Sequence, residues 1–116
     1  MNYEWCFSDD KPIYPQIVEQ MERLIVSGGL LPGDKLPSVR DLARDAQVNP
    51  NTMMRALSEL ENNELVISHR VNGKFVTDDA ELIKKIKDEL AESVIKEFLK
   101  NMNQLGFTKE EILKLL

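Results

Sequence analysis

The chain has 116 residues, of which 42% are hydrophobic, and a formal net charge of −5. That length suits one small domain or a domain with an additional arm, and no apolar run is long enough to span a membrane. The opening residues MNYEWCFSDDKP lack the basic-then-apolar pattern of a secretory signal, and the single cysteine, Cys6, excludes an internal disulfide, so we expect a cytoplasmic protein.

Residues 3–8 predict an N-terminal arm, because they are aromatic and mildly extended, and we expect this arm to pack on the body of the protein. Cys6 stands between Trp5 and Phe7 and is most simply a packing residue. A reactive thiol is the alternative, but no basic residue lies beside Cys6 to stabilise a thiolate.

Residues 12–27 predict the first helix. Pro15 falls in its first turn, where the missing N–H is tolerated, and Gly28–Gly29 ends the helix. A turn at Pro32–Gly33 follows, and Leu36 is expected to form a short bridge to a later hairpin. The apolar stripe of the helix favours one wall of a three-helix core over a partner-binding helix. This stripe comprises Ile13, Ile17, Met21, Leu24 and Ile25.

Two short helices joined by a tight turn come next. Ser38 caps the first, with Asp41 three residues on to complete a capping box, and this helix should stop near Ala46. Asn49 caps the second, and Pro50 at its first position loses nothing by lacking an N–H. The predicted buried faces comprise Val39, Leu42, Ala43 and Ala46 in the first helix and Met53, Ala56, Leu57 and Leu60 in the second.

The second of these helices leaves Asn51, Thr52 and Arg55 pointing away from the core near its N-terminus. This is the layout of a helix-turn-helix, whose second helix places its N-terminal side chains in the major groove of DNA. Two capped amphipathic helices also occur in bundles that never touch nucleic acid, so the pattern alone leaves both interpretations open. The small, polar or basic outward residues and the hairpin that follows favour DNA binding.

A β-hairpin is predicted directly after this motif, with strands at residues 65–71 and 74–77 and a two-residue turn at Asn72–Gly73. Asn-Gly is the strongest short-range hairpin signal, because both turn positions take positive φ. After a helix-turn-helix such a hairpin forms a wing, whose tip is expected to reach phosphate or the minor groove. An ordinary solvated tip is the alternative. The tip gathers His69, Arg70, Asn72, Gly73 and Lys74.

From Asp79 onwards the pattern becomes helical. Its apolar stripe is too long for the DNA-binding body to cover, so we expect it to pack against the same helix of a second copy. Gly106 breaks this helix, and Thr108 opens a last helix with another capping box. The predicted dimerisation residues are Leu82, Ile83, Ile86, Leu90, Val94, Ile95, Phe98, Leu99 and Met102.

The charges are sorted along the helix-turn-helix although the whole chain is acidic. Four basic side chains stand there against two acidic ones, namely Lys35, Arg40, Arg44 and Arg55 against Asp41 and Asp45. The acidic residues Glu59, Glu61 and Glu64 lie at the far end of the second helix. When the N-terminal side chains of that helix enter the major groove, this end points away from the phosphates. A local positive face is sufficient for operator binding, and it predicts weak non-specific binding.

The residues from Pro12 to Val76 resemble the DNA-binding domain of the GntR family of bacterial transcription regulators. The matching strings are PIYPQI (12–17), LLPGDKLPSVRDLA (30–43), VNPNTMMRALSELE (48–61) and the wing ending in GKFV (73–76). The short tail and the string VNPNT resemble the small YtrA-like branch. Two positions depart from the family pattern: Glu64 stands where the family usually has glycine, and Val71-Asn72-Gly73 replaces the usual Gly-x-Gly of the wing tip.

The resemblance implies roles for the outward residues. Asn51, Thr52 and Arg55 would face bases, while Ser38, Arg40 and Arg44 would hold the DNA backbone, where a helix N-terminus adds a favourable dipole. It also implies a dimer formed through the tail, which is too short for the large ligand-binding domains of most family members. The full set of predicted DNA-binding residues is Ser38, Arg40, Arg44, Asn49, Asn51, Thr52, Arg55, His69, Arg70, Asn72, Gly73 and Lys74.

We therefore predict a mainly α protein with a small β-hairpin, in which a winged helix-turn-helix DNA-binding domain (1–78) precedes a helical dimerisation tail (79–116). The predicted function is sequence-specific transcription regulation by a homodimeric repressor on a two-fold double-stranded DNA operator. A winged-helix protein–protein interaction module is the alternative, and the existence of a small-molecule effector stays open. No enzyme or cofactor signature is present: the chain has no Gly-rich phosphate loop, no Cys cluster and a single histidine, His69.

Overall fold

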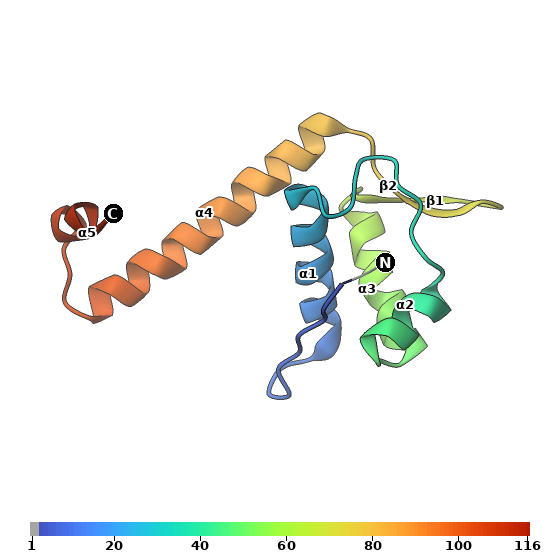
Figure 1. Ribbon diagram of the computed structural model, residues 1–116, viewed down its shortest axis with the longest axis horizontal. Coiled ribbons are helices and arrows are strands. Elements are labelled where there is room, and N and C mark those ends of the chain that lie inside the picture. Colours follow the sequence, from blue (N-terminus) through green and yellow to red (C-terminus); the bar gives the residue numbers. More distant parts are fainter. Residues whose placement is uncertain (1–2) are drawn as a thin grey trace. The chain divides into compact units, whose positions relative to one another are not determined.

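A computed structural model describes residues 3–116, and within them the chain forms five helices and one two-stranded antiparallel sheet (Figure 1). The elements are α1 (Ile13–Ser27), α2 (Val39–Ala46), α3 (Pro50–Asn62), β1 (Val66–His69), β2 (Gly73–Val76), α4 (Ala80–Gln104) and α5 (Lys109–Leu115). The predicted fold class, a winged helix-turn-helix followed by a helical tail, is confirmed. The chain divides into two compact units, Met1–Lys84 and Lys85–Leu116, which are described separately.

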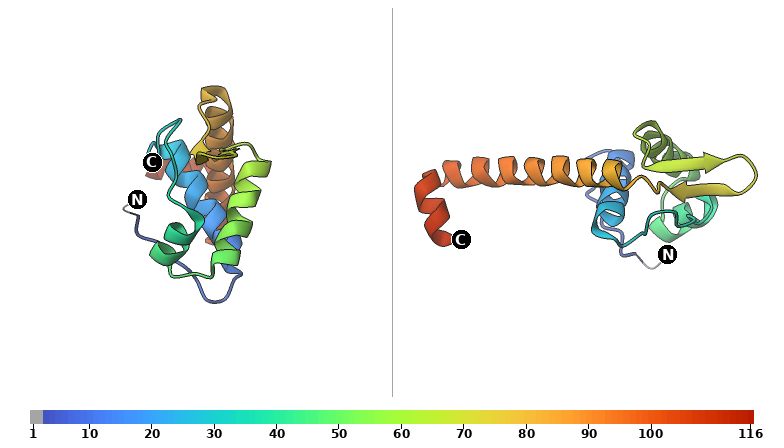
Figure 2. Two further views of the ribbon diagram at one scale, coloured as in Figure 1. Left: turned by 90° about the vertical axis from the view of Figure 1, so that its right-hand side faces the viewer. Right: turned by 90° about the horizontal axis from the view of Figure 1, so that it is seen from above.

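The core of the first unit lies between α1, α2 and α3. Helices α1 and α3 lie side by side, and α2 packs against α3 (Figures 1 and 2). Each helix buries the apolar stripe predicted for it, except that Ile13, Leu24 and Val39 are only half-buried. The predicted residues that are buried are Ile17, Met21, Ile25, Leu42, Ala43, Ala46, Met53, Ala56, Leu57 and Leu60.

Local caps set the ends of these helices. The Ser38 side chain accepts a hydrogen bond from the Asp41 backbone N–H (3.1 Å), and Asn49 Oδ1 accepts one from the Asn51 N–H (2.8 Å). The capping box predicted on α2 is only half formed, because the Asp41 carboxylate pairs with Arg44 instead of reaching back to Ser38. Aspartate is one methylene shorter than the glutamate or glutamine of a full capping box.

The wing hairpin has a register different from the predicted one. Val66 pairs with Val76 and His69 with Gly73, so three residues, 70–72, connect the strands. The predicted two-residue turn at Asn72–Gly73 is therefore wrong; of these two residues only Gly73 has positive φ, +97°. That turn would pair Val71 with Lys74 and leave Val76 opposite His69. Pairing the two buried valines sets the register, because a shift by an odd number of residues moves every side chain to the other face.

The segment before α2 lies along the second strand of the wing. The Leu36 N–H donates to the Lys74 carbonyl (2.8 Å), and the Val76 N–H donates to the Asp34 carbonyl (2.8 Å). An isolated bridge joins Lys35 to Phe75, and Leu36 is buried. The predicted bridge near Leu36 is confirmed, and it ties the wing to the loop that leads into α2.

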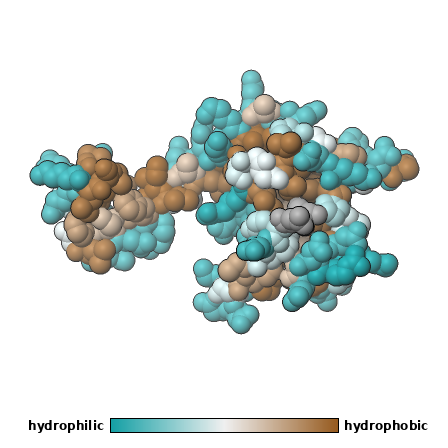
Figure 3. Space-filling model, viewed as in Figure 1, coloured by the Kyte–Doolittle hydropathy of each residue, from teal (hydrophilic) through white to brown (hydrophobic). Residues whose placement is uncertain are grey.

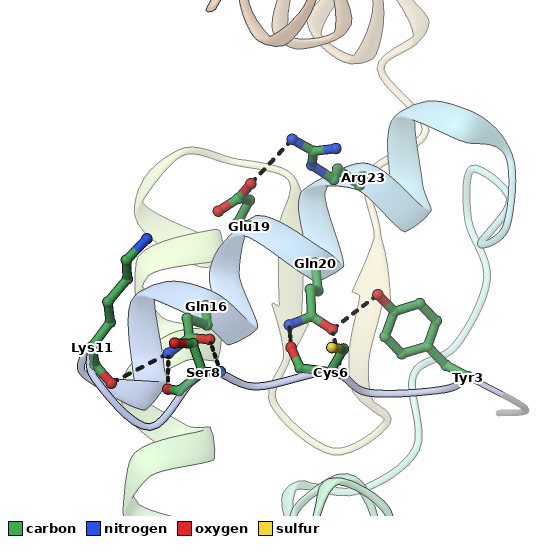
Figure 4. A pocket seen from close by; sticks show the side chains of 8 residues that line it. All are labelled: Tyr3, Cys6, Ser8, Lys11, Gln16, Glu19, Gln20 and Arg23. Carbon is green, nitrogen blue, oxygen red and sulfur yellow. Dashed lines mark hydrogen bonds and ion pairs between the residues drawn. The ribbon is translucent and has the colours of Figure 1, made fainter. Parts of the chain in front are cut away.

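The N-terminal arm is bound to α1 by two glutamine side chains (Figure 4). Gln20 accepts from the Cys6 N–H (3.2 Å) and donates to the Cys6 carbonyl (2.7 Å). Gln16 does the same to Ser8, at 2.7 and 2.9 Å. The arm therefore packs on the body as predicted, but the interpretation of Cys6 as a packing residue is wrong. Its side chain is exposed, because alternate residues of an extended segment face opposite ways and Trp5 and Phe7 are the half-buried ones.

The second unit contains most of α4, together with α5. Gly106 follows α4 with φ +92°, and Thr108 and Glu111 form the predicted capping box at the start of α5. Ile86 and Ile112 are buried, whereas Val94, Ile95 and Phe98 are 50%, 55% and 39% exposed. Ile86, which was predicted to face a second copy, is therefore already covered within one chain. Along residues 3–116, no helix has both the length and the apolar character that a membrane span needs.

Candidate DNA-binding surface

One face of α3 is exposed along its length, opposite the buried face. Asn51, Arg55 and Ser58 recur on it at spacings of four and three residues, which place side chains on one side of a helix. Asn51 and Arg55 are exposed and Thr52 is half-buried, in agreement with the orientation predicted for them. Their polar groups lie near the N-terminal end of the second helix of the motif, where major-groove readers stand.

Met54 and Ser58 belong to the same exposed face but were missing from the predicted site. Met54 is 53% exposed, and the Ser58 hydroxyl donates to the Met54 carbonyl (2.9 Å). Their spacing from Asn51, three and seven residues, was the signal that could have found them. A thymine methyl group would suit the apolar Met54 side chain.

The guanidinium of Arg55 lies over an aromatic ring of another helix. Its Cζ atom lies 3.8 Å from the centroid of the Tyr14 ring, at the start of α1. Tyr14 was absent from the predicted site, and no local pattern in the sequence could have paired it with Arg55. The two meet because α1 packs against α3.

The residues predicted to hold the DNA backbone lie at and near the start of α2. Ser38, Arg40 and Arg44 are all exposed. Ser38 Oγ is engaged as the helix cap, and Arg44 donates to the Asp41 carboxylate. The Asn49 side-chain oxygen likewise accepts the hydrogen bond that caps α3. Helix N-termini of this kind carry partial positive charge that attracts phosphate.

At the tip of the wing, Arg70, Asn72 and Gly73 are exposed. His69 is exposed as well, and its ring meets the Phe75 ring edge-on, with centroids 4.9 Å apart and planes at 76°. The structure thus brings four of the five predicted wing residues together at the tip.

Lys74 does not belong to this group. It shares a face of the hairpin with the buried Val76, because residues two apart on a strand point the same way. Its ammonium group forms an ion pair with Glu61 of α3, and both side chains are largely covered, at 25% and 30% exposure. The placement of Lys74 at the tip was therefore wrong, since side-chain alternation turns it towards α3.

Two titrating groups of the arm have shifted pKa values. Burial raises the pKa of the Tyr3 hydroxyl, and a hydrogen bond from Ser8 lowers the pKa of the Asp10 carboxyl. Among residues 3–116 no group of three or more metal-binding side chains occurs. The chemistry that the α2–α3 surface offers is charge and hydrogen bonding at the ends of two helices.

Comparison with known proteins gives this surface a family context. The sequence profile described as "Bacterial regulatory proteins, gntR family" matches residues 13–76. The Bacillus subtilis protein YhcF, an uncharacterized HTH-type transcriptional regulator, is 46% identical over 108 residues, covering 93% of this chain and 89% of YhcF. The HTH-type transcriptional repressor YtrA of the same organism is 42% identical over 90 residues, covering 72% of this chain and 69% of YtrA.

Solved structures agree with the sequence relatives. A GntR family transcriptional regulator from Listeria monocytogenes superposes with a TM-score of 0.88 at 41% identity, covering 94% of this chain and 96% of that one. The DNA-binding domain of AraR, solved in complex with operator ORE1, superposes with a TM-score of 0.55 at 26% identity over 65% of this chain and 94% of its own. Because the family profile covers more than half of the chain and regulators match it over most of its length, this chain belongs to the GntR family and is a DNA-binding transcription regulator.

Proposed function

We propose that the protein is a repressor that binds a two-fold operator as a homodimer, with residues 1–78 reading DNA and residues 79–116 forming the dimer. The observation that carries this proposal is the exposed face of α3, where Asn51 and Arg55 project near the start of the helix. Helix α3 enters the major groove, and α2 lies across the DNA backbone.

The contacts divide into two kinds. Asn51, Thr52 and Arg55 read base edges, since amide and guanidinium groups can form paired hydrogen bonds to adenine and guanine. Arg40 and Arg44, the start of α2 and the wing tip bind phosphates, which position the protein but carry no sequence information. Arg44 donates one hydrogen bond to the Asp41 carboxylate and keeps further N–H donors for a phosphate.

The uncovered apolar side chains of the tail support dimerisation through it. On the face drawn in Figure 3, hydrophobic residues of the second unit gather at the surface beside hydrophilic ones. The exposed large apolar side chains of the second unit include Val94, Ile95, Phe98, Leu105, Leu113, Leu115 and Leu116. An exposed apolar surface of this extent marks an association site, and a second copy offers the same surface in return.

Repression is the mode of regulation that the relatives favour, because YtrA, which matches most of this chain, is named a transcriptional repressor. A repressor needs only to occupy an operator that overlaps a promoter. The short tail is sufficient for that role, because it only has to join two DNA-binding domains.

The test compares Arg55→Ala with Arg40→Ala on two duplexes, one from the protein's own promoter and one of random sequence. Arg55→Ala is expected to weaken promoter binding by about 1–3 kcal/mol and to change random-DNA binding little. Arg40→Ala is expected to weaken both, because a phosphate contact reads no sequence. Equal losses on both duplexes for Arg55→Ala would contradict its assignment as a base reader, and a parent protein without preference for its promoter at two salt concentrations would contradict the proposed function.

A further inference from the structure

The Arg55 guanidinium has a defined position in the protein without DNA. It lies over the Tyr14 ring, with 3.8 Å between Cζ and the ring centroid. Arg55 is exposed on α3, whereas Tyr14 is half-buried in the first turn of α1. A guanidinium this close to the face of an aromatic ring forms a cation–π contact. The contact joins the reading helix to the helix that supports it.

This contact leaves the hydrogen-bonding capacity of Arg55 unused. A guanidinium is planar, with its five N–H donors in the plane. A guanidinium that lies flat on a ring keeps its edge for hydrogen bonds, so its donors stay available for a guanine edge or a phosphate. Arg44 offers the contrast, because part of its donor edge is already engaged by the Asp41 carboxylate.

We propose that Tyr14 is a positioning residue for DNA recognition, whose ring holds the Arg55 guanidinium in one orientation while its edge stays free to bind DNA. The inference rests on the proposed function and assigns it a further residue. Ordering a long, flexible side chain on binding costs affinity. A ring that restricts Arg55 beforehand removes part of that cost. The mechanism needs the aromatic ring and does not need the hydroxyl group.

The test uses a duplex that the parent protein selects from a random-sequence DNA library, and a scrambled duplex of the same composition. Tyr14→Leu removes the ring but keeps an apolar side chain, and it is expected to weaken binding to the selected duplex about two- to fivefold, the range of an exposed cation–π contact. Binding to the scrambled duplex should change less. Tyr14→Phe is the matched control and should bind as the parent does.

A double-mutant cycle separates positioning from a direct DNA contact. In an Arg55→Ala background, Tyr14→Leu should cause no further loss, because there is no guanidinium left to position. The same loss in both backgrounds would overturn the inference, as would equal losses for Tyr14→Phe and Tyr14→Leu, which would point to the hydroxyl group. A silent Tyr14→Leu would overturn it as well.

Nuclear magnetic resonance of the parent protein tests the stack without any variant. The side-chain protons of Arg55 should be shifted upfield by the ring current of Tyr14 in the absence of DNA. Random-coil shifts would overturn the inference, even if Tyr14→Leu failed to fold. A parent protein that selects no sequence from the library would overturn the proposed function too, whereas a selective parent with a silent Tyr14→Leu would overturn only the role of Tyr14.

Discussion

Glu64 holds a backbone conformation that side chains other than glycine rarely adopt. Its φ is +67°, and it stands at the position where the family pattern usually has glycine. Two hydrogen bonds hold the turn around Glu64. The Glu64 N–H donates to the Glu61 carbonyl (3.0 Å), and the Leu65 N–H donates to Asn63 Oδ1 (3.1 Å). Leu65 is fully buried. The surrounding structure therefore imposes the conformation on a residue that does not favour it.

Glu64→Gly is expected to stabilise the protein by about 0.5–1 kcal/mol. The left-handed conformation costs a residue with a Cβ about 1–2 kcal/mol, and the greater freedom of glycine in the unfolded chain offsets about 0.5–1 kcal/mol of that gain. Urea denaturation measures the difference. Glu64→Ala is the control, since it shortens the side chain but keeps the Cβ, and it should leave the stability nearly unchanged. A less stable glycine variant would show that the turn carries no strain.

At the scale of elements, the wing is fastened to the body by its inner face and free at its tip. The ion pair between Lys74 and Glu61 joins β2 to the end of α3. Bonds from residues 33–36 join the other edge of β2 to the loop before α2. Arg70, in the connection between the strands, is exposed. Of the two basic residues, Lys74 thus joins the hairpin to α3, whereas Arg70 faces solvent.

Lys74→Ala and Arg70→Ala should separate these functions. Lys74→Ala is expected to lower the free energy of unfolding by about 0.5–1 kcal/mol, the value of a partly exposed ion pair, and to leave the salt dependence of DNA binding unchanged. Arg70→Ala is expected to keep the stability and to reduce the salt dependence by about one phosphate contact. Denaturation and binding titrations at several salt concentrations measure the two effects. If Lys74→Ala instead reduced the salt dependence and Arg70→Ala reduced the stability, Lys74 would have to leave Glu61 and bind DNA.

The N-terminal arm is a second element whose attachment has a simple geometric origin. Gln16 and Gln20 are one helical turn apart, about 6 Å along α1, and Ser8 and Cys6 are two residues apart, about 6.6 Å in an extended strand. The near match lets each amide group pair with the N–H and the carbonyl of one arm residue, as a neighbouring β-strand would.

Replacing both glutamines by alanine should release the arm and leave the three-helix core folded. Hydrogen exchange of the Cys6 and Ser8 amide protons is expected to accelerate to the rate of an unprotected chain, while the buried part of α3 stays protected. Glu19→Ala is the control on the same helix, because Glu19 pairs with Arg23 and not with the arm. Slow exchange at Cys6 and Ser8 in the double variant would assign the attachment to the aromatic side chains instead.

At the scale of the whole molecule, affinity for an operator depends on the number of DNA-binding domains that bind together. One recognition helix contacts only a few base pairs, and a chain with net charge −5 gains little from general attraction to phosphate. Two copies on a two-fold axis read half-sites about one helical turn of DNA apart, or a multiple of that. Once the first DNA-binding domain is bound, the second binds its half-site intramolecularly, which raises the affinity without a new kind of contact.

The double variant Leu90→Asp with Val94→Asp should therefore be monomeric and bind its operator roughly a hundredfold or more weakly. Val94 is 50% exposed in the single chain, so aspartate is tolerated there, but burying it between two copies costs roughly several kcal/mol. Sedimentation velocity measures the assembly and a binding titration the affinity.

Lys85→Gln with Lys96→Gln is the matched control for this variant. It makes the same change of −2 in net charge at exposed positions on the polar side of α4, and it should stay dimeric. A dimeric aspartate variant, or a monomer that binds as tightly as the parent, would show that the tail has another function.

The sequence by itself determined the helices and the family. The ends of α1, α2, α3 and α5 depend on Gly28, Ser38, Asn49 and Thr108, each of which acts on backbone groups at most four residues away. The stripes that α1, α2 and α3 bury repeat with the helical period, and the strings PGDKLPSVRDLA and VNPNT carry the family pattern in a continuous stretch. Such signals need no knowledge of the packed structure, because the interacting groups are neighbours in the chain.

Only the tertiary structure decided how distant residues meet. The Asn-Gly signal predicted a two-residue turn, but the gain from burying Val66 opposite Val76 set another register, and that register turned Lys74 towards Glu61. Tyr14 meets Arg55 because α1 packs on α3. Cys6 is exposed because the arm lies extended on α1, where Gln20 holds the Cys6 backbone and alternate side chains face outward. These contacts join residues between 10 and 41 positions apart. Strand register and helix packing, which bring them together, arise only when the whole core is assembled.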